Sequence, residues 1–297
     1  MKSTGNKILS IIGAGRVGTT LGYLISKNRL LFGGIYSRSR GAAERALRFI
    51  GRGKIYRSLT ELISESGVNI IAVPDSEIEK LVVEILEDMK PNRQGLRGKI
   101  FLHTCGSIPS TVLMPLKHHG ANVGSMHPLQ SISSPECGIV LLRDSYFCIE
   151  GEERAVKAAE RIVRRIGGKS FLVNPEDKHA YHLAASLLSN QIVSLADMVM
   201  EVLPGRFSKK KWLRIFAPLI GGTAENLKRA GLPDALTGPI SRGDVITIRE
   251  HLKVLREADP ALRRLHRILA RRELDIAHRQ GKLSTRRLAY LRKVIGD

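Results

Sequence analysis

The sequence predicts an α/β fold, with a Rossmann-like, doubly wound and mostly parallel sheet followed by an all-α C-terminal domain. Three observations support this prediction: short apolar runs alternate with amphipathic stretches up to residue 173, the first run ends in a glycine-rich turn, and only helical patterns follow. Strands that alternate with helices are typical of βαβ units, whose strands run parallel. We therefore expect two domains, at residues 1–173 and 174–297.

The predicted strands of the first domain are short apolar runs that end at glycine, proline or polar residues. They lie at residues 8–12, 33–37, 68–73, 99–103, 121–125, 146–149 and 169–173. Several of the segments between them repeat apolar residues at helical spacing, which predicts helices packed by one face. These helices lie at residues 19–26, 42–50, 76–89 and 152–166.

The pattern changes after Val173. Asn174-Pro175-Glu176-Asp177 predicts a helix start, because Asn is a favoured N-cap, Pro suits the first helical position and acidic residues favour the first turn. The remaining chain is leucine-rich and helical in pattern, and its apolar stripes exceed what one such segment buries alone. We therefore expect a homodimer built mainly by residues 174–297.

The formal net charge of +20 favours anionic partners, which are either nucleic acids or small anionic molecules. The basic residues are spread along the whole chain. Aromatic residues make up only 5% and do not interleave with basic runs, as a base-stacking surface requires. The sequence therefore argues against specific nucleic-acid binding and favours a small anionic substrate.

Cysteine usage and hydropathy predict a cytoplasmic protein without metal. The three cysteines have no CxxC spacing, which argues against a disulfide framework or a structural zinc site. No apolar run approaches the ~20 residues that cross a bilayer, and the N-terminus does not have the pattern of a signal peptide. We therefore expect no membrane association.

Gly13-Ala14-Gly15-Arg16-Val17-Gly18 forms a GxGxxG motif between the first predicted strand and the first predicted helix. In this context the first glycine permits a tight turn, the second lets the backbone approach a pyrophosphate, and the third allows close helix–strand packing. The start of the helix offers unpaired N–H groups to the phosphates. The motif therefore predicts a dinucleotide site.

The end of the second strand distinguishes NAD from NADP. Ser37-Arg38-Ser39-Arg40 stands where an acidic residue would hold the ribose 2′-hydroxyl of NAD. Hydroxyl groups and a guanidinium instead match a 2′-phosphate, although a solvated basic turn has the same composition. Val73 and Pro74 end the third strand at the same edge, where we expect them to line the nicotinamide side. NADP is the predicted cofactor.

His127 is the first candidate for proton transfer. It follows a strand at the cofactor edge, and Pro128 biases it toward an extended conformation. An imidazole donates or accepts a proton near neutral pH. The alternative is a structural histidine bonded to backbone.

Further candidates lie in the helical half. On a wheel of about 100° per residue, His182 and Asn190 share a polar stripe that is uncharged in its middle, which suits the wall of a polar pocket. A helix contact or a solvent face without charge is the alternative. Arg242, in the loop 238–244, is a candidate clamp for a substrate carboxylate or phosphate; the alternative is a solvated turn in which Asp244 caps the next helix.

These motifs together resemble a known superfamily. The matching segments are residues 13–18, 72–75, 103–106, 124–131, 181–185, 189–190 and 238–244. They are similar to the oxidoreductases of the 6-phosphogluconate dehydrogenase superfamily, which includes pyrroline-5-carboxylate reductase, prephenate dehydrogenase and ketopantoate reductase. They most resemble an uncharacterised group in which a Rossmann-like domain precedes a helical domain of unknown function. The resemblance implies an NADP-dependent redox role but no substrate.

The predicted function is hydride transfer between NADP(H) and a C=O or C=N group of a small, anionic substrate. His127, His182 and Asn190 would polarise or protonate the substrate, and Arg242 would orient it. Superfamily relatives often use a helix lysine near an asparagine, whereas this chain has His182 ahead of Asn190. The alternative is a non-catalytic NADP-sensing protein that recruits a partner through its helical domain.

Overall fold

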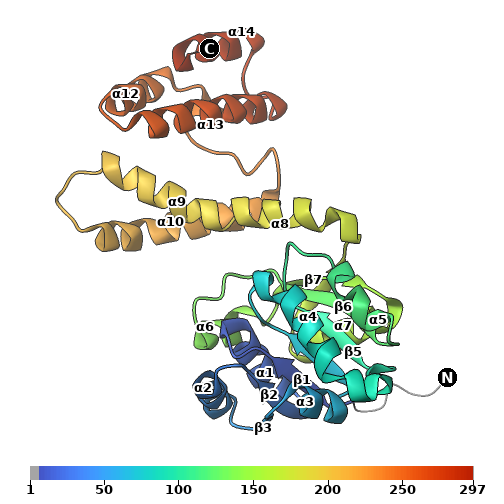
Figure 1. Cartoon of the computed structure of the whole chain (residues 1–297). Helices are drawn as coiled ribbons and strands as arrows, with labels where there is room; N and C mark the ends of the chain where they lie inside the picture. Colours follow the sequence, from blue (N-terminus) through green and yellow to red (C-terminus); the bar gives the residue numbers. More distant parts are fainter. Residues whose placement is uncertain (1–6, 297) are drawn as a thin grey trace. The chain divides into compact units, whose positions relative to one another are not determined.

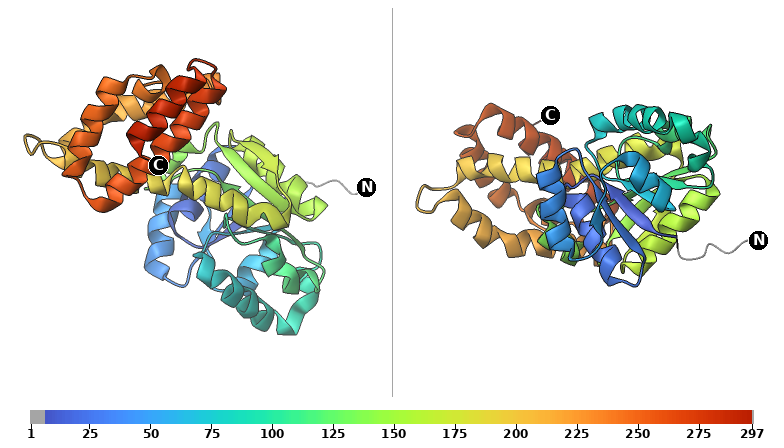
Figure 2. Two further views of the ribbon diagram at one scale, coloured as in Figure 1. Left: turned by 90° about the horizontal axis from the view of Figure 1, so that it is seen from above. Right: turned by 60° about the horizontal axis from the view of Figure 1, so that its bottom comes forward.

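The computed structural model describes residues 7–296, and the chain divides after Ser189 into two compact units. The first unit is built around an eight-stranded sheet with helices on both faces, and the second unit is helical (Figures 1 and 2). The expected α/β fold with an all-α C-terminal part is confirmed. This division lies beyond residues 173–174, because the helix that begins at Lys178 packs onto the first unit. The boundary at residues 173–174 stays a prediction.

The sheet has the strand order β3-β2-β1-β4-β5-β6-β7-β8, and every neighbouring pair is parallel except β6 and β7. The strands are β1 (Leu9–Ile12), β2 (Phe32–Tyr36), β3 (Lys54–Ile55), β4 (Val68–Ile71), β5 (Ile100–His103), β6 (Asn122–Pro128), β7 (Tyr146–Gly151) and β8 (Lys169–Leu172). In register, Ile12 lies opposite both Tyr36 and Ile71. The carboxyl ends of β1, β2 and β4 therefore meet at one edge, where the strand order reverses and ligands bind in this fold class.

Helices cover the two faces of this sheet. They are α1 (Arg16–Lys27), α2 (Arg40–Ile50), α3 (Leu59–Glu65), α4 (Ile78–Asp88), α5 (Met114–Lys117), α6 (Pro135–Leu141) and α7 (Glu153–Arg165). Helix α8 (Lys178–Leu187) follows β8 and is the last helix of the first unit. Short 3₁₀ segments are η1 (Asp75–Glu77), η2 (Lys90–Leu96), η3 (Ser110–Leu113) and η4 (Pro175–Asp177). One apolar core joins the sheet to α1, α2 and α7, and a second joins it to α3, α4 and α5. This arrangement positions the edge loops from both faces.

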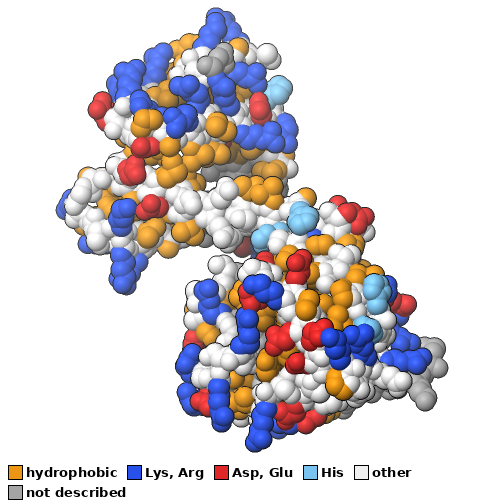
Figure 3. Space-filling model, viewed as in Figure 1, with side chains coloured by type: hydrophobic (Ala, Val, Ile, Leu, Met, Phe, Trp, Pro, Cys, Tyr) orange, Lys and Arg blue, Asp and Glu red, His pale blue; other side chains and the backbone are white. Residues whose placement is uncertain are grey.

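The described part of the second unit consists of helices and the loops that connect them. They are α9 (Asn190–Val199), α10 (Lys209–Ala230), α11 (Pro239–Arg242), α12 (Val245–Arg256), α13 (Pro260–Arg279) and α14 (Thr285–Ile295), with the 3₁₀ segment η5 (Met200–Val202). A small core forms between α11, α12, α13 and α14. The Asp244 carboxylate accepts the N–H of Thr247, which confirms that Asp244 caps α12. On the visible face of the part that contains α12–α14, many Lys and Arg side chains stand among hydrophobic ones (Figure 3).

Helices α9 and α10, both within the described residues, bury no side chain completely. Their exposed apolar side chains include Val193 on α9 and Leu219 on α10, with 71% and 66% of their surface accessible. The unit thus has large apolar area that its own core does not cover, which is unusual for a free protein surface.

The expectation that no segment reaches membrane length needs a correction. Among the described residues, the stretch Pro175–Val202 is long and apolar enough to cross a membrane by length and composition. It is, however, interrupted between α8 and α9, and Lys178 within it is completely buried in protein.

Candidate active site

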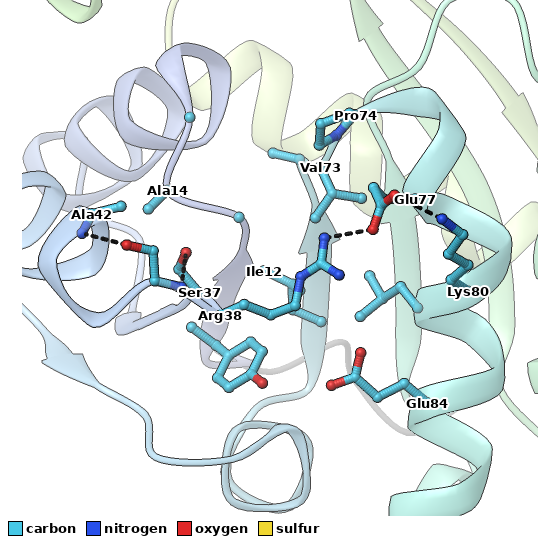
Figure 4. A pocket seen from close by; sticks show the side chains of 16 residues that line it. Ile12, Ala14, Ser37, Arg38, Ala42, Val73, Pro74, Glu77, Lys80 and Glu84 are labelled. Carbon is cyan, nitrogen blue, oxygen red and sulfur yellow. Dashed lines mark hydrogen bonds and ion pairs between the residues drawn. The ribbon is translucent and has the colours of Figure 1, made fainter.

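A cavity of about 320 Å³ opens at the carboxyl ends of β1, β2 and β4 (Figure 4). Of the residues that the sequence predicts to bind a cofactor, Gly13, Ala14, Gly15, Ser37, Arg38, Ser39, Val73 and Pro74 line it. Arg16, Val17 and Gly18 follow in the first turn of α1. The structure thus brings the glycine-rich turn, the basic turn after β2 and the end of β4 together, as predicted.

The glycines of the turn differ in what surrounds them. A Cβ at Gly13, where φ is +115°, would lie 2.3 Å from the carbonyl oxygen of Ala72, and a Cβ at Gly18 would lie 2.1 Å from the carbonyl oxygen of Gly13. Backbone contact therefore requires glycine at both positions. A Cβ at Gly15 would meet nothing within 4 Å. Because Gly15 borders the open cavity, it leaves room there for a phosphate to approach the backbone.

Two serines and the start of α1 supply hydrogen-bonding groups to this cavity. Ser37 Oγ accepts the N–H of Ser39, and Ser39 Oγ accepts the N–H of Ala42 and caps α2. Each hydroxyl keeps its own proton for an acceptor in the cavity. No side chain within the described residues caps α1, so its first N–H groups remain available to an anion.

The opposite wall of the cavity contains charged residues that the sequence analysis missed. Glu77 precedes α4, and its carboxylate binds Arg38 Nη2 at 2.5 Å and Lys80 Nζ at 3.1 Å. The hydrogen bonds from these two cations lower the pKa of Glu77. Glu84 lies one helical turn beyond Lys80 and also lines the cavity. In the sequence, only the predicted helix start at residue 76 pointed to these charged residues. The sequence does not show which face of α4 borders the cavity.

A second cluster forms around His127 at the end of β6. Its Nδ1 lies 2.9 Å from the phenol oxygen of Tyr181 on α8, and its ring centroid lies 5.9 Å from that of His182. A Cβ at Gly106 would lie 2.8 Å from His127 Nε2 and 2.5 Å from His182 Cδ2. Both imidazoles therefore converge on the loop after β5. The structure brings the two predicted histidines together.

The half-buried His127 is neutral near pH 7. Burial, the Lys178 ammonium and His182 lower the pKa of His127 to about 4. Its chemistry in the free protein is therefore that of a neutral imidazole, with one N–H donor and one acceptor nitrogen. An imidazolium, which general acid catalysis by a free histidine would use, is absent at neutral pH.

Beneath this cluster lies a buried ion pair that the sequence analysis did not predict. Lys178, one helical turn before His182, donates to Ser125 Oγ at 2.7 Å, to the carbonyl oxygen of Cys105 at 3.1 Å and to Glu150 Oε1 at 3.3 Å. Burial lowers the pKa of Lys178, and the Glu150 carboxylate opposes this effect. The three acceptors match the three protons of an ammonium, so Lys178 anchors α8 to the sheet and to the loop after β5.

The polar stripe of α8 faces inward. His182 and Ser186 are half-buried, whereas Leu183 and Leu188 on the opposite arc are exposed, Leu188 to 73%. This part of the stripe is therefore not a fully solvent-exposed face, and the pocket-wall interpretation stays a prediction. Asn190 and Arg242 belong to the second unit, and both side chains are exposed there. Their predicted contribution to the site stays a prediction.

The strand order, the glycine-rich turn and the edge cavity define a Rossmann-like nucleotide-binding protein. Comparison with protein families agrees: residues 4–128 match the Rossmann-like domain, and residues 145–273 match a domain of unknown function, DUF2520. The chain thus combines a match to the Rossmann-like domain with a following match to DUF2520. The search of curated proteins found no match.

Solved structures with the same fold include oxidoreductases. A Bacteroides fragilis protein provisionally described as an NADP oxidoreductase is 24% identical, with a TM-score of 0.68 over 91% of this chain and 99% of that one. A Thermotoga maritima protein is 26% identical, with the same TM-score over 92% and 99%. An imine reductase from Myxococcus stipitatus in complex with NADP⁺ is 17% identical, with a TM-score of 0.57 over 93% and 94%. These similarities confirm the fold along nearly the whole chain.

Proposed function

We propose that the protein is an NADP(H)-dependent reductase that acts on a C=O or C=N group of a small, anionic substrate. The observation that carries this proposal is the edge cavity, in which the glycine-rich turn and the basic turn after β2 lie together. The similarity to a protein described as an NADP oxidoreductase and to an imine reductase supports the same reaction class. When bound, NADPH supplies the hydride, and the protein supplies binding, orientation and a proton.

The residues of the cavity fit NADP. Gly15 leaves space beside the start of α1 for the pyrophosphate, and Arg38 with the hydroxyls of Ser37 and Ser39 fits a 2′-phosphate. No acidic residue stands between Ser37 and Arg40, where NAD-binding proteins hold the ribose hydroxyl. These features support NADP over NAD as the cofactor.

His127 is the proposed donor of a hydrogen bond to the substrate. If Tyr181 donates its hydroxyl proton to Nδ1, the neutral imidazole carries its own proton on Nε2, which faces Gly106. This N–H hydrogen-bonds the oxygen or nitrogen of a C=O or C=N group and polarises it. When the carbon takes the hydride, the Nε2 proton passes to that oxygen or nitrogen, and solvent returns a proton to the imidazole, which becomes neutral again. His182, on the same side of Gly106, is placed to assist.

Lys178 has a positioning role in this proposal. Its ammonium makes three protein contacts and is completely buried, so it orients Tyr181 and His182 through α8 and does not donate to the substrate. We propose that Asn190 and Arg242 complete the substrate site, Asn190 by hydrogen bonding and Arg242 by holding an anionic group. Residue type and chain position support these two assignments.

The protein is further proposed to be a cytoplasmic homodimer. The exposed apolar side chains of α8, α9 and α10 support self-association, because such area is unfavourable in water. The proposed function is tested by calorimetric titration with NADPH and NADH, followed by NADPH oxidation with keto acids and cyclic imines. Tight NADPH binding and turnover of at least one substrate are expected. Equal affinity for NADH would contradict the cofactor assignment, and binding without any turnover would favour the NADP-sensing alternative.

A further inference from the structure

Glu77 lies between two cations of the cavity, and both of its carboxylate oxygens are engaged. Oε2 binds the Arg38 guanidinium, which comes from the end of β2, and Oε1 binds the Lys80 ammonium on the first turns of α4 (Figure 4). All three side chains line the same cavity. The Glu77 carboxylate therefore connects the cavity wall formed by the end of β2 to the wall formed by α4, and it pairs with a positive charge on each.

This arrangement is unexpected in a cavity that fits an anionic ligand. Glu77 is only 21% exposed, whereas Arg38 and Lys80 are 66% and 73% exposed. The two cations are thus accessible from the cavity, and the carboxylate between them supplies the counter-charge. A phosphate monoester has three terminal oxygens and accepts charge-assisted hydrogen bonds from the same donor types.

We propose that Glu77 holds the position of the 2′-phosphate in the free protein, and that Lys80 is the second cation of the 2′-phosphate site. This inference rests on the proposed NADP-dependent function. Binding of the 2′-phosphate exchanges the Arg38–Glu77 and Lys80–Glu77 ion pairs for contacts of the same cations with phosphate. Glu77 is then a specificity-determining residue: it weakens binding of every 2′-phosphorylated ligand, and it leaves ligands without this phosphate unaffected.

The energetic effect has the size of exposed ion pairs. Loss or gain of such a pair corresponds to an affinity change of about 1.5- to 5-fold. Because the charges are accessible, the effect weakens as ionic strength rises. When Arg38 and Lys80 contact the phosphate, Glu77 loses both of its ion pairs. The contact of Lys80 with the phosphate, from the wall opposite Arg38, offsets part of this loss.

The experiment compares two probes, adenosine 2′,5′-bisphosphate and adenosine 5′-monophosphate, by calorimetric titration of the full-length protein at low salt. Glu77→Gln removes the competing charge, and Lys80→Gln removes the second cation. The Glu87–Lys90 ion pair provides matched controls, since it has the same three-residue spacing and neither residue lines the cavity. We expect Glu77→Gln to tighten bisphosphate binding by about 2- to 5-fold and Lys80→Gln to weaken it similarly, with monophosphate binding unchanged.

The outcomes separate this inference from the proposed function. Weaker bisphosphate binding by Glu77→Gln, or equal effects on both probes, overturns the role of Glu77; unchanged binding by Lys80→Gln overturns that of Lys80. In these cases the unmodified protein still prefers the bisphosphate, and NADP dependence stands. If the unmodified protein binds both probes equally, the NADP preference itself fails, and this inference fails with it.

Discussion

The Lys178 ammonium lies 3.3 Å from Oε1 of Glu150, and both side chains are removed from solvent. Glu150 also accepts the N–H and the hydroxyl of Ser110, at 2.8 and 2.6 Å. The pair thus connects α8, β7 and η3, and it lies next to the loop that carries Gly106, because Lys178 also donates to the carbonyl oxygen of Cys105. Buried charges persist in proteins only when they are paired and hydrogen-bonded, and this pair meets both conditions.

Loss of one member of this pair should strongly destabilise the protein. Lys178→Met leaves the Glu150 carboxylate buried without its cation, which typically costs about 3–5 kcal/mol. The double variant Lys178→Met with Glu150→Gln should recover part of this loss, because the amide oxygen still accepts from Ser110 and no charge remains. The free energy of unfolding from urea titration tests both variants. Lys157→Met, which removes an exposed ion pair with Glu153, is the control and should change stability by no more than about 0.5 kcal/mol.

Arg38 should discriminate between the two cofactors. Arg38→Ala removes a charge-assisted hydrogen bond to the 2′-phosphate, so we expect NADPH binding to weaken by about 1–3 kcal/mol and NADH binding to change little. Arg40 is the matched control, since it lies in the same basic turn, pairs with Glu44 and does not line the cavity. Fluorescence titration of both cofactors against both variants provides the measurement. Similar losses for Arg38→Ala and Arg40→Ala would show a general effect of surface charge.

Stability should fall in mild acid because of His127. The pKa of this residue is lowered to about 4 when folded, against about 6.5 in the unfolded chain. Below pH 6.5 the unfolded chain binds a proton that the folded chain takes up only near pH 4, so the free energy of unfolding decreases over this window. The total contribution is about 3 kcal/mol. Urea unfolding between pH 4.5 and 7.5 should show a smaller decrease for His127→Asn than for the unmodified protein, and His179→Asn, at an exposed position on α8, should follow the unmodified protein.

Substitution of His127 or His182 should lower the turnover rate and leave the affinity for the cofactor nearly unchanged. A positioned proton donor contributes about 10²–10⁴-fold to the rate, and neither imidazole lines the cofactor cavity. His127→Ala and His182→Ala should therefore lower kcat on this scale while the NADPH dissociation constant stays nearly constant. Tyr181→Phe removes only the hydroxyl that bonds Nδ1 of His127, and we expect a smaller loss of kcat. Full activity of His127→Ala would remove this residue from the mechanism.

Elements of the fold could be predicted from the sequence where the residue pattern is local and long enough to show a period. The long strands and the GxGxxG turn were predicted because their pattern is local. The two-residue strand β3 and the short helices α3 and α6 carry too few residues to show a period. Lys178 and Glu150 are 28 residues apart in sequence, and nothing local indicates that both are buried. The sequence likewise does not indicate that Glu77 faces Arg38. The packing of α4 against the sheet decides which acidic residue reaches the cavity.

Self-association through the helical part is the last prediction. Helices α9 and α10 expose apolar side chains such as Val193 and Leu219, and burial of apolar area contributes about 25 cal/mol per Å². Light scattering at micromolar concentration should therefore give the mass of two chains. Val193→Glu and Leu219→Glu place charges on this area and should shift the mass toward one chain. Ile268 is equally exposed, at 66%, but lies on α13 among arginines, so Ile268→Glu should keep the mass of two chains. A single-chain mass for the unmodified protein would contradict the prediction, because the exposed apolar area of α9 and α10 would then face water.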